Sequence, residues 1–391
     1  MPELINDKAA LTVENLMELA SRRSGLDDFG PGSFQEGLNI LVTAMRKEAE
    51  LSGAGIKAQS ERLINSLIAR LRKTDFLREH PEILKEEIDV AAVIVGLPRT
   101  GSTMFQRLLA ASPKLTATYW WETIYPVPLP SEKSSLERIE MAETLVEQIM
   151  GAAENFDSIH PLNARAFDEE LTLIEHSFAS NMPESMMFVP SYGEWLLETD
   201  QSHAYDELIE YLKILQWQSS ERTNQRWVLK SPHHLTATKT ALDKFPAALM
   251  VVPHRSIQDV MPSWYSMVGS LSAAESDRPD LGKQQALHWT TRLDRCLQDM
   301  MAIRAQQPER FLDIGYKTLL KNPMDACSVA FDRMGMQLEE TDRQAFENHL
   351  NENKRGDRPA HSYNLADYGV TLAELDGRFE YYAKEFRRYF D

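Results

Sequence analysis

The chain has 391 residues, of which 43% are hydrophobic, and its 42 basic and 59 acidic residues give a net charge of −17. This acidic balance disfavours a nucleic-acid partner, because nucleic acids bind basic surfaces. The longest apolar stretches, at 91–96 and 247–252, are too short to span a membrane. The N-terminus lacks the basic start and apolar run of a signal peptide, so we expect a cytoplasmic protein.

Residues 11–88 show helical periodicity and no strand-like run. Apolar residues recur three and four positions apart in the segments 11–23, 33–53, 56–73 and 80–88. A GAG sequence at 53–55 predicts a break before the third segment. We therefore predict an N-terminal helical extension or cap over residues 1–88, ahead of an α/β domain over 89–391. The sequence leaves open whether these helices only pack on the core or also cover a substrate.

From residue 90 onward, strand-like runs alternate with helix-like segments. The four runs are AAVIVG at 91–96, RWVLK at 226–230, AALMVVPHR at 247–255 and RFLDIGYK at 310–317. Repeated units of this kind predict an α/β fold with a parallel sheet in three layers. Ligands bind such sheets at the carboxyl ends of the strands, and the motif-like residues of this chain follow those ends. A helical insertion at about 131–223 is a candidate wall for a substrate pocket.

The stretch VIVGLPRTGST at 93–103 predicts a strand, a loop and the start of a helix, an arrangement that favours an oxyanion. Gly96 and Gly101 have the GxxxxG spacing of the nucleotide P-loop, but Ser102 stands where that motif has lysine. The positive charge lies inside the loop as Arg99, whose planar fork suits phosphate or sulfate. The candidate ligands of the oxyanion are Pro98, Arg99, Thr100, Gly101, Ser102 and Thr103.

Three later segments follow this loop in a fixed order: WVLKSPHHL at 227–235, VVPHRSIQDVMPSWY at 251–265 and NENKRGDRPAHSY at 351–363. Together with the loop they resemble the sulfotransferases that use 3′-phosphoadenosine 5′-phosphosulfate, and the second segment is closest to the LKSPxHL form of bacterial members. The resemblance covers about residues 90–385. It implies a P-loop-like sulfotransferase fold, adenosine 3′,5′-bisphosphate as product, no metal, and transfer of the sulfonate to a hydroxyl of a small or lipid-like acceptor.

The resemblance also implies roles for individual basic residues. Arg255 and Ser263, which with Asp259 have the RxxxDxxxS spacing, would bind the 3′-phosphate of the donor. The late basic loop would close over the same phosphate through Lys354, Arg355 and Gly356. Arg99 and Lys230 would stabilise the negative charge that grows on the departing nucleotide.

The base that accepts the proton of the acceptor hydroxyl stays open between residues of two segments. His234 matches the histidine of the SPxHL pattern, and His233 stands beside it. Glu122 follows the first helix, where tyrosylprotein sulfotransferases carry a catalytic glutamate. A histidine titrates near neutrality, whereas Glu122 would need an apolar setting of the kind that Trp120 and Trp121 can supply. We favour His234 as the base and keep Glu122 as the alternative.

Two other functions compete with sulfonate transfer. A P-loop-type nucleotide kinase or hydrolase is disfavoured by Ser102 in the lysine position and by the lack of a clear metal-binding aspartate after a strand. A non-catalytic nucleotide-binding module is disfavoured by the presence of Arg99, Lys230 and His234. The sequence leaves the oligomeric state open, a homo-oligomer included.

Overall fold

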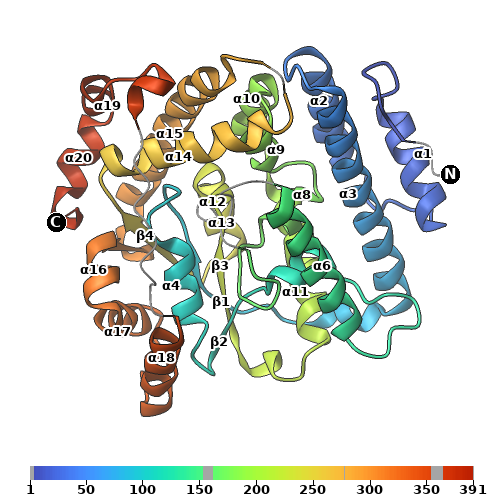
Figure 1. The fold of residues 1–391 in the computed structure, drawn as a ribbon. Helices are drawn as coiled ribbons and strands as arrows, with labels where there is room; N and C mark the ends of the chain where they lie inside the picture. Colours follow the sequence, from blue (N-terminus) through green and yellow to red (C-terminus); the bar gives the residue numbers. More distant parts are fainter. Residues whose placement is uncertain (1–3, 153–161, 277, 354–363, 391) are drawn as a thin grey trace.

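The computed structural model describes residues 4–152, 162–276, 278–353 and 364–390 (Figure 1). Within these residues, the strands form one parallel sheet in the order β2-β3-β1-β4-β5, so that β1 is central. The strands are β1 (Val90–Ile94), β2 (Leu115–Thr116), β3 (Arg226–Lys230), β4 (Leu249–His254) and β5 (Phe311–Gly315). All four predicted strands are present. The edge strand β2 was not predicted, because two residues are too few to show a period.

Alternate residues of the strands pack into two separate hydrophobic clusters, one on each face of the sheet. In β1, Val93 belongs to the larger cluster and Ile94 to the smaller one. In β4, Met250 and Val251 divide in the same way. Since successive side chains of a strand point to opposite faces, the sheet is covered on both sides. The predicted three-layer α/β architecture is confirmed.

Different helices cover the two faces (Figure 1). The smaller cluster includes apolar residues of α4 (Ser102–Leu109), α17 (Pro323–Arg333) and α18 (Glu340–Glu352). The larger cluster includes residues of α11 (Ser202–Trp217), α13 (Thr238–Lys244), α14 (Ile257–Ala273) and α15 (Leu281–Gln306). Strand β3 is followed first by the short helix α12 (His233–Thr236), and β5 by α16 (Tyr316–Lys321). Two further helices, α19 (Leu372–Arg378) and α20 (Glu380–Phe386), lie near the C-terminus.

The N-terminal segment forms helices that share the core of the α/β domain. They are α1 (Val13–Ser24), α2 (Phe34–Lys47), α3 (Gly53–Glu79) and the 3₁₀ helix η1 (Pro81–Lys85). Their apolar residues belong to the same cluster as the sheet residues of β1 and β3. Buried ion pairs join α3 to α11, since Arg70 and Lys73 both contact Glu207. The predicted break at 53–55 instead begins α3, where the Ser52 side chain accepts a hydrogen bond from the Gly55 amide.

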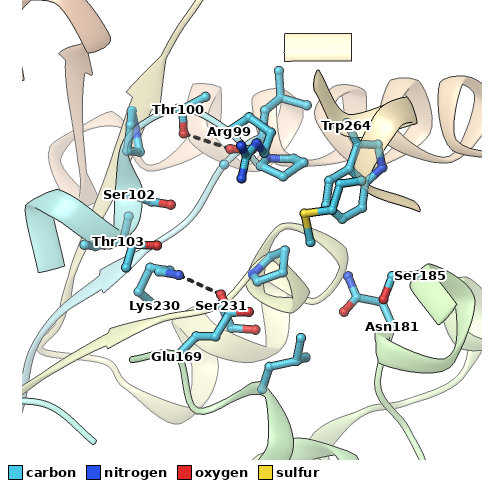
Figure 2. A pocket seen from close by; sticks show the side chains of 18 of the residues that line it. Arg99, Thr100, Ser102, Thr103, Glu169, Asn181, Ser185, Lys230, Ser231 and Trp264 are labelled. Carbon is cyan, nitrogen blue, oxygen red and sulfur yellow. Dashed lines mark hydrogen bonds and ion pairs between the residues drawn. The ribbon is translucent and has the colours of Figure 1, made fainter. Parts of the chain in front are cut away.

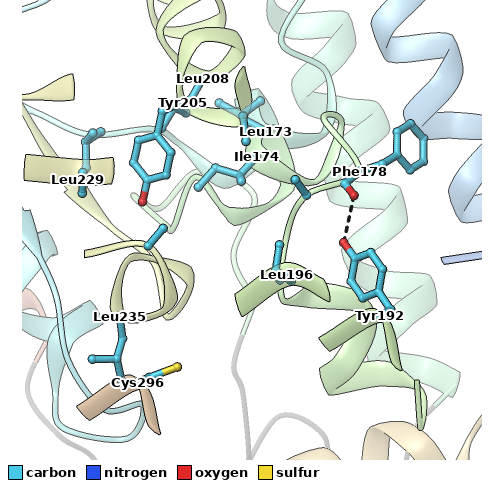
Figure 3. Close-up of a cluster of buried hydrophobic side chains, with 14 of the residues drawn as sticks. Leu173, Ile174, Phe178, Tyr192, Leu196, Tyr205, Leu208, Leu229, Leu235 and Cys296 are labelled. Atoms are coloured by element: carbon cyan, nitrogen blue, oxygen red, sulfur yellow. Dashed lines mark hydrogen bonds between the residues drawn. The ribbon is translucent and has the colours of Figure 1, made fainter. Parts of the chain in front are cut away.

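The segment between β2 and β3 is helical, as the sequence predicted for about 131–223. It contains α5 (Trp120–Ile124), α6 (Leu136–Ala152), α8 (Leu171–Glu175), α9 (Met182–Met186) and α10 (Pro190–Glu198) before α11. Figure 3 shows residues of this insertion, including Leu173 and Tyr205, in one buried cluster with Leu229 of β3. The insertion is thereby fixed against the sheet. No helix among the described residues is long and apolar enough to cross a membrane.

Candidate functional site

The loop between β1 and α4 has the strained backbone of a binding loop. Arg99 has a φ of 64°, a left-handed conformation that is rare for a residue with a side chain. Gly101 caps α4 with a φ of 82° and must be glycine, because a Cβ there would approach the Tyr316 ring to 3.0 Å. The Thr100 hydroxyl is buried and donates to Leu97 O at 2.8 Å. Thr100 therefore holds the loop closed, while Ser102 and Thr103 begin the helix.

The predicted RxxxDxxxS segment contacts this loop directly. Arg99 Nε donates a hydrogen bond to Ser263 Oγ of α14 at 3.0 Å. Arg255, which follows β4, donates through Nη1 to the carbonyl of Arg99 at 3.0 Å. The Arg255 guanidinium also lies 4.4 Å from the centre of the Tyr316 ring, a cation–π distance. Arg99, Arg255 and Ser263 thus form one cationic cluster at the carboxyl end of the sheet.

A pocket opens beside the loop at the carboxyl ends of β1 and β3 (Figure 2). The predicted residues Arg99, Ser102, Thr103 and Lys230 line it. The other lining residues that the sequence predicted for the oxyanion are Pro98 and Thr100. The insertion and the long helices α14 and α15 supply further parts of its wall: Glu169, Leu171, Asn181, Ser185, Trp264, Met267 and Trp289. The sheet end and the insertion therefore enclose one site, as the sequence led us to expect.

Sequence reasoning missed the acidic triplet that precedes α8, in which each carboxylate has a different partner. Asp168 Oδ2 accepts a hydrogen bond from Arg107 of α4 at 3.2 Å. Glu169 Oε2 lies 2.6 Å from the ammonium of Lys230 in the pocket. Glu170 turns inward, where its Oε2 accepts from the Lys230 backbone amide at 3.1 Å. The triplet fastens the insertion to α4 and β3 and leaves one carboxylate, Glu169, in the pocket wall.

The structure places His234 away from the pocket lining. The side chain is fully buried, and both ring nitrogens are engaged. Its Nε2 lies 2.6 Å from Glu170 Oε1, and its Nδ1 lies 2.7 Å from the Tyr205 hydroxyl oxygen, both hydrogen-bond distances. A general base must reach the proton that it removes, and His234 has no free nitrogen for this. The structure therefore gives His234 the geometry of a residue that orients Glu170.

Glu122 lies apart from the same pocket. It is buried in α5, where both of its carboxylate oxygens accept hydrogen bonds from Arg222 at 2.7 and 2.8 Å. Its Oε2 also accepts from the Tyr119 amide at 2.9 Å and so caps the helix. Glu122 borders a different hollow, beneath the edge strand β2. Its contacts are those of a buried structural ion pair.

The remaining predicted ligands, Lys354, Arg355 and Gly356, lie outside the described residues. His233 is fully buried and is absent from the pocket lining. Burial is the main cause that holds the pKa of His233 well below its usual value, and the positive charge of Arg292 lowers it further. His233 is therefore neutral at ordinary pH. Among the described residues, no group of three or more acidic, histidine or cysteine side chains has the arrangement of a metal site.

Comparison with known proteins assigns this site to a family. The model of the sulfotransferase family matches residues 92–340, which is more than half of the chain and includes the loop, Glu169, Lys230 and Arg255. The chain belongs to the sulfotransferase family. No match is found among curated proteins. The predicted family is confirmed, and sulfotransfer is the activity that the family and the fold support.

Solved structures agree with this assignment. The sulfotransferase is similar to sulfotransferase STF1 from Mycobacterium tuberculosis, with 29% sequence identity over 95% of this chain and 99% of that one and a TM-score of 0.84. It shares the fold of sulfotransferase STF9 from Mycobacterium avium, with 22% identity, coverage of 96% and 97%, and a TM-score of 0.86. In both comparisons the similarity includes the N-terminal helices, since it covers nearly the whole chain.

Proposed function

We propose that this sulfotransferase takes its sulfonate from 3′-phosphoadenosine 5′-phosphosulfate and transfers it to a hydroxyl of a small or lipid-like acceptor. The observation that carries this proposal is the cluster of Arg99, Arg255 and Ser263 beside the loop. The loop amides, Ser102 and Thr103 suit the 5′-phosphosulfate, and Arg255 with Ser263 suits the additional 3′-phosphate. The donor carries these two anionic groups on the 5′ and 3′ positions of one ribose, and the loop and the Arg255–Ser263 pair offer one set of donors for each.

The chemistry needs a base, a cation and a positioned donor. The acceptor oxygen forms a bond to sulfur while the bond from sulfur to the bridging oxygen breaks, and the departing bisphosphate keeps the electron pair. We assign the base to Glu169, because it is the carboxylate that lines the pocket and touches Lys230. Glu169 takes the hydroxyl proton, and Lys230 stabilises the charge on the leaving oxygen. An ammonium has three protons, so Lys230 can hold Glu169 and a donor oxygen together.

We also propose roles for the late basic loop and a location in the cell. Lys354, Arg355 and Gly356 stay candidate ligands of the 3′-phosphate on the strength of the resemblance alone. The chemistry proposed here needs no metal. A cytoplasmic location stays a prediction from the sequence.

Transfer of radioactive label tests the proposed function. The enzyme is incubated with ³⁵S-labelled 3′-phosphoadenosine 5′-phosphosulfate and a panel of phenols, sterols and aliphatic alcohols, and in parallel with γ-³²P-labelled ATP and magnesium. We expect ³⁵S on at least one alcohol or phenol and no transfer of ³²P. Transfer of label from ATP alone would reject the proposed donor and favour a kinase.

A further inference from the structure

One wall of the pocket carries a buried amide side chain that lacks a partner. Asn181, just before α9, lines the pocket and is only 5% exposed. Its Oδ1 accepts no hydrogen bond from any described residue. Buried polar atoms are nearly always hydrogen-bonded, because burial removes their contacts with water. An unpaired amide oxygen at a pocket wall points to a ligand that donates a hydrogen bond.

The backbone around Asn181 is held in place. The backbone N–H of Asn181 donates a hydrogen bond to His233 Nδ1 at 3.3 Å. The backbone N–H of the preceding residue, Ser180, donates to the Tyr192 hydroxyl at 3.1 Å. The same hydroxyl donates to the backbone carbonyl of Ser180 at 2.8 Å. Tyr192 is fully buried. The segment therefore cannot swing outward to hydrate the carboxamide without breaking these contacts.

The helix that follows is clamped as well. Glu184 of α9 accepts hydrogen bonds from Arg292 and His288 of α15, at 2.9 Å in each case. Gly193 of α10 packs against the same carboxylate so closely that a Cβ would lie 2.1 Å from Glu184 Oε1. The insertion and α15 thus hold the Asn181 side of the pocket rigid. A rigid wall keeps the carboxamide in one position, so that little reorganisation is needed when a ligand binds.

The surroundings of Asn181 are apolar and lie away from the donor loop. Figure 2 shows Asn181, Ser185 and Trp264 on the side of the pocket opposite Ser102, Thr103 and Lys230. Four further residues of the pocket lining are uncharged: Leu171, Pro232, Met267 and Trp289. The rings of Trp264 and Trp289 meet edge to face, with centroids 4.9 Å apart at 86°. Such walls suit a flat, uncharged ring.

We propose that Asn181 determines acceptor specificity, and that the acceptor is an uncharged ring compound with a second hydroxyl besides the one that reacts. This inference rests on the proposed function, which places the reacting hydroxyl between Glu169 and the donor. The second hydroxyl donates to Asn181 Oδ1, and the ring packs between Leu171 and the two tryptophans. An analogue without that donor leaves the amide oxygen unpaired, and sites of this kind discriminate strongly against such analogues.

Matched acceptor pairs test the inference. Each of the three dihydroxybenzenes is compared with its own monomethyl ether, which keeps one hydroxyl and the ring but loses the second donor. For at least one pair we expect kcat/KM of the wild-type enzyme to be about tenfold or more higher for the diol. Asn181→Leu, which keeps the side-chain size, should bring that ratio close to one. We expect 4-hydroxybenzoate, which carries a charge, to be used about tenfold less well than hydroquinone.

The control is Asn39→Leu on the exposed face of α2, which should leave the ratio unchanged. Calorimetric binding of the same pairs to enzyme loaded with adenosine 3′,5′-bisphosphate gives a second readout that is independent of turnover. Equal use of diol and ether in all three pairs by the wild-type enzyme overturns the inference, and so does an unchanged ratio in the Asn181→Leu variant. A failure of the proposed function looks different, since no compound would then accept label from the donor and the bisphosphate would not bind.

Discussion

The ammonium of Lys230 lies 2.6 Å from Glu169 Oε2, at the point where β3 ends in the pocket. The Lys230 side chain is 5% exposed and that of Glu169 is 21% exposed, so the pair faces the pocket and is largely shielded from bulk water. The backbone of Lys230 is fixed independently, because its amide donates to Glu170. A carboxylate and an ammonium are thus held in contact with each other beside the loop between β1 and α4.

Replacement of the proposed base should stop the chemistry and spare the fold. Glu169→Gln keeps the shape of the side chain but cannot take a proton, so kcat should fall by about 10²–10⁴-fold. Steady-state label transfer measures kcat, and calorimetry with adenosine 3′,5′-bisphosphate should show nearly unchanged donor-site affinity. Glu147→Gln, at an exposed position of α6, is the control. Wild-type turnover in the Glu169→Gln enzyme would remove Glu169 from the mechanism.

Lys230 should matter most for the departing nucleotide. Lys230→Met keeps the length of the side chain and removes its charge, so we expect kcat to fall by about 10²–10³-fold, as when a donor to a developing oxyanion is lost. Single-turnover label transfer separates this effect from product release. The exposed Lys239 of α13 provides the matched control, Lys239→Met. A rate of chemistry equal to that of the wild type would assign charge stabilisation to another group.

Glu122 should behave as a structural residue. Because Glu122→Gln leaves Arg222 buried beside an uncharged amide, the free energy of unfolding should fall by about 3–5 kcal/mol. We expect kcat of the folded variant to stay near that of the wild type. Urea unfolding and label transfer measure the two quantities. The opposite result, lost turnover at unchanged stability, would restore Glu122 as the base.

The protein should lose stability in acid partly through His176. Burial, with the charges of Arg70 and Lys73, lowers the pKa of His176 to about 3. In the unfolded chain the pKa is about 6.5, so below this pH the unfolded state binds the additional proton. The contribution of His176 to the free energy of unfolding is therefore complete above pH 6.5. It is lost, at about 1.4 kcal/mol per pH unit, as the pH falls toward 3.

Urea unfolding at several pH values between 4 and 7 measures this slope. His176→Gln should make it shallower by about 1.4 kcal/mol per pH unit. Asn39→Gln, which replaces an exposed residue that does not titrate, should leave the slope unchanged. Identical slopes for the His176 variant and the wild type would mean that His176 does not titrate on unfolding.

The sequence predicted the sheet and the donor loop well, because both depend on local patterns. Four apolar runs were long enough to mark strands, and the glycine spacing at 96 and 101 marked the loop between β1 and α4. The RxxxDxxxS spacing singled out Arg255 and Ser263 as 3′-phosphate ligands by resemblance, and the structure adds that both contact Arg99 of the loop. Each of these features involves residues close in sequence or motifs with a strict order.

The carboxylate that contacts Lys230 in the pocket could not be predicted in the same way. Glu169 stands in a DEE triplet outside any strand-following motif, and only the fold shows that Glu170 turns inward to His234 while Glu169 turns toward Lys230. His234 matched a motif, but its burial by Tyr205 depends on α11, which is distant in sequence. An acidic triplet within a region of weak strand signal was the available sign, and it does not indicate which carboxylate faces the pocket.

Binding of matched nucleotides to an Arg255 variant tests the proposed donor site most directly. Calorimetry compares adenosine 3′,5′-bisphosphate with adenosine 5′-phosphate for the wild type, for Arg255→Ala and for the exposed control Arg295→Ala. We predict that Arg255→Ala lowers the affinity for the bisphosphate by about 10–150-fold, which corresponds to the loss of one hydrogen bond to a charged group. The affinity for adenosine 5′-phosphate should change far less. An equal loss of affinity for both nucleotides, or no preference of the wild type for the bisphosphate, would contradict the assignment of Arg255 to the 3′-phosphate.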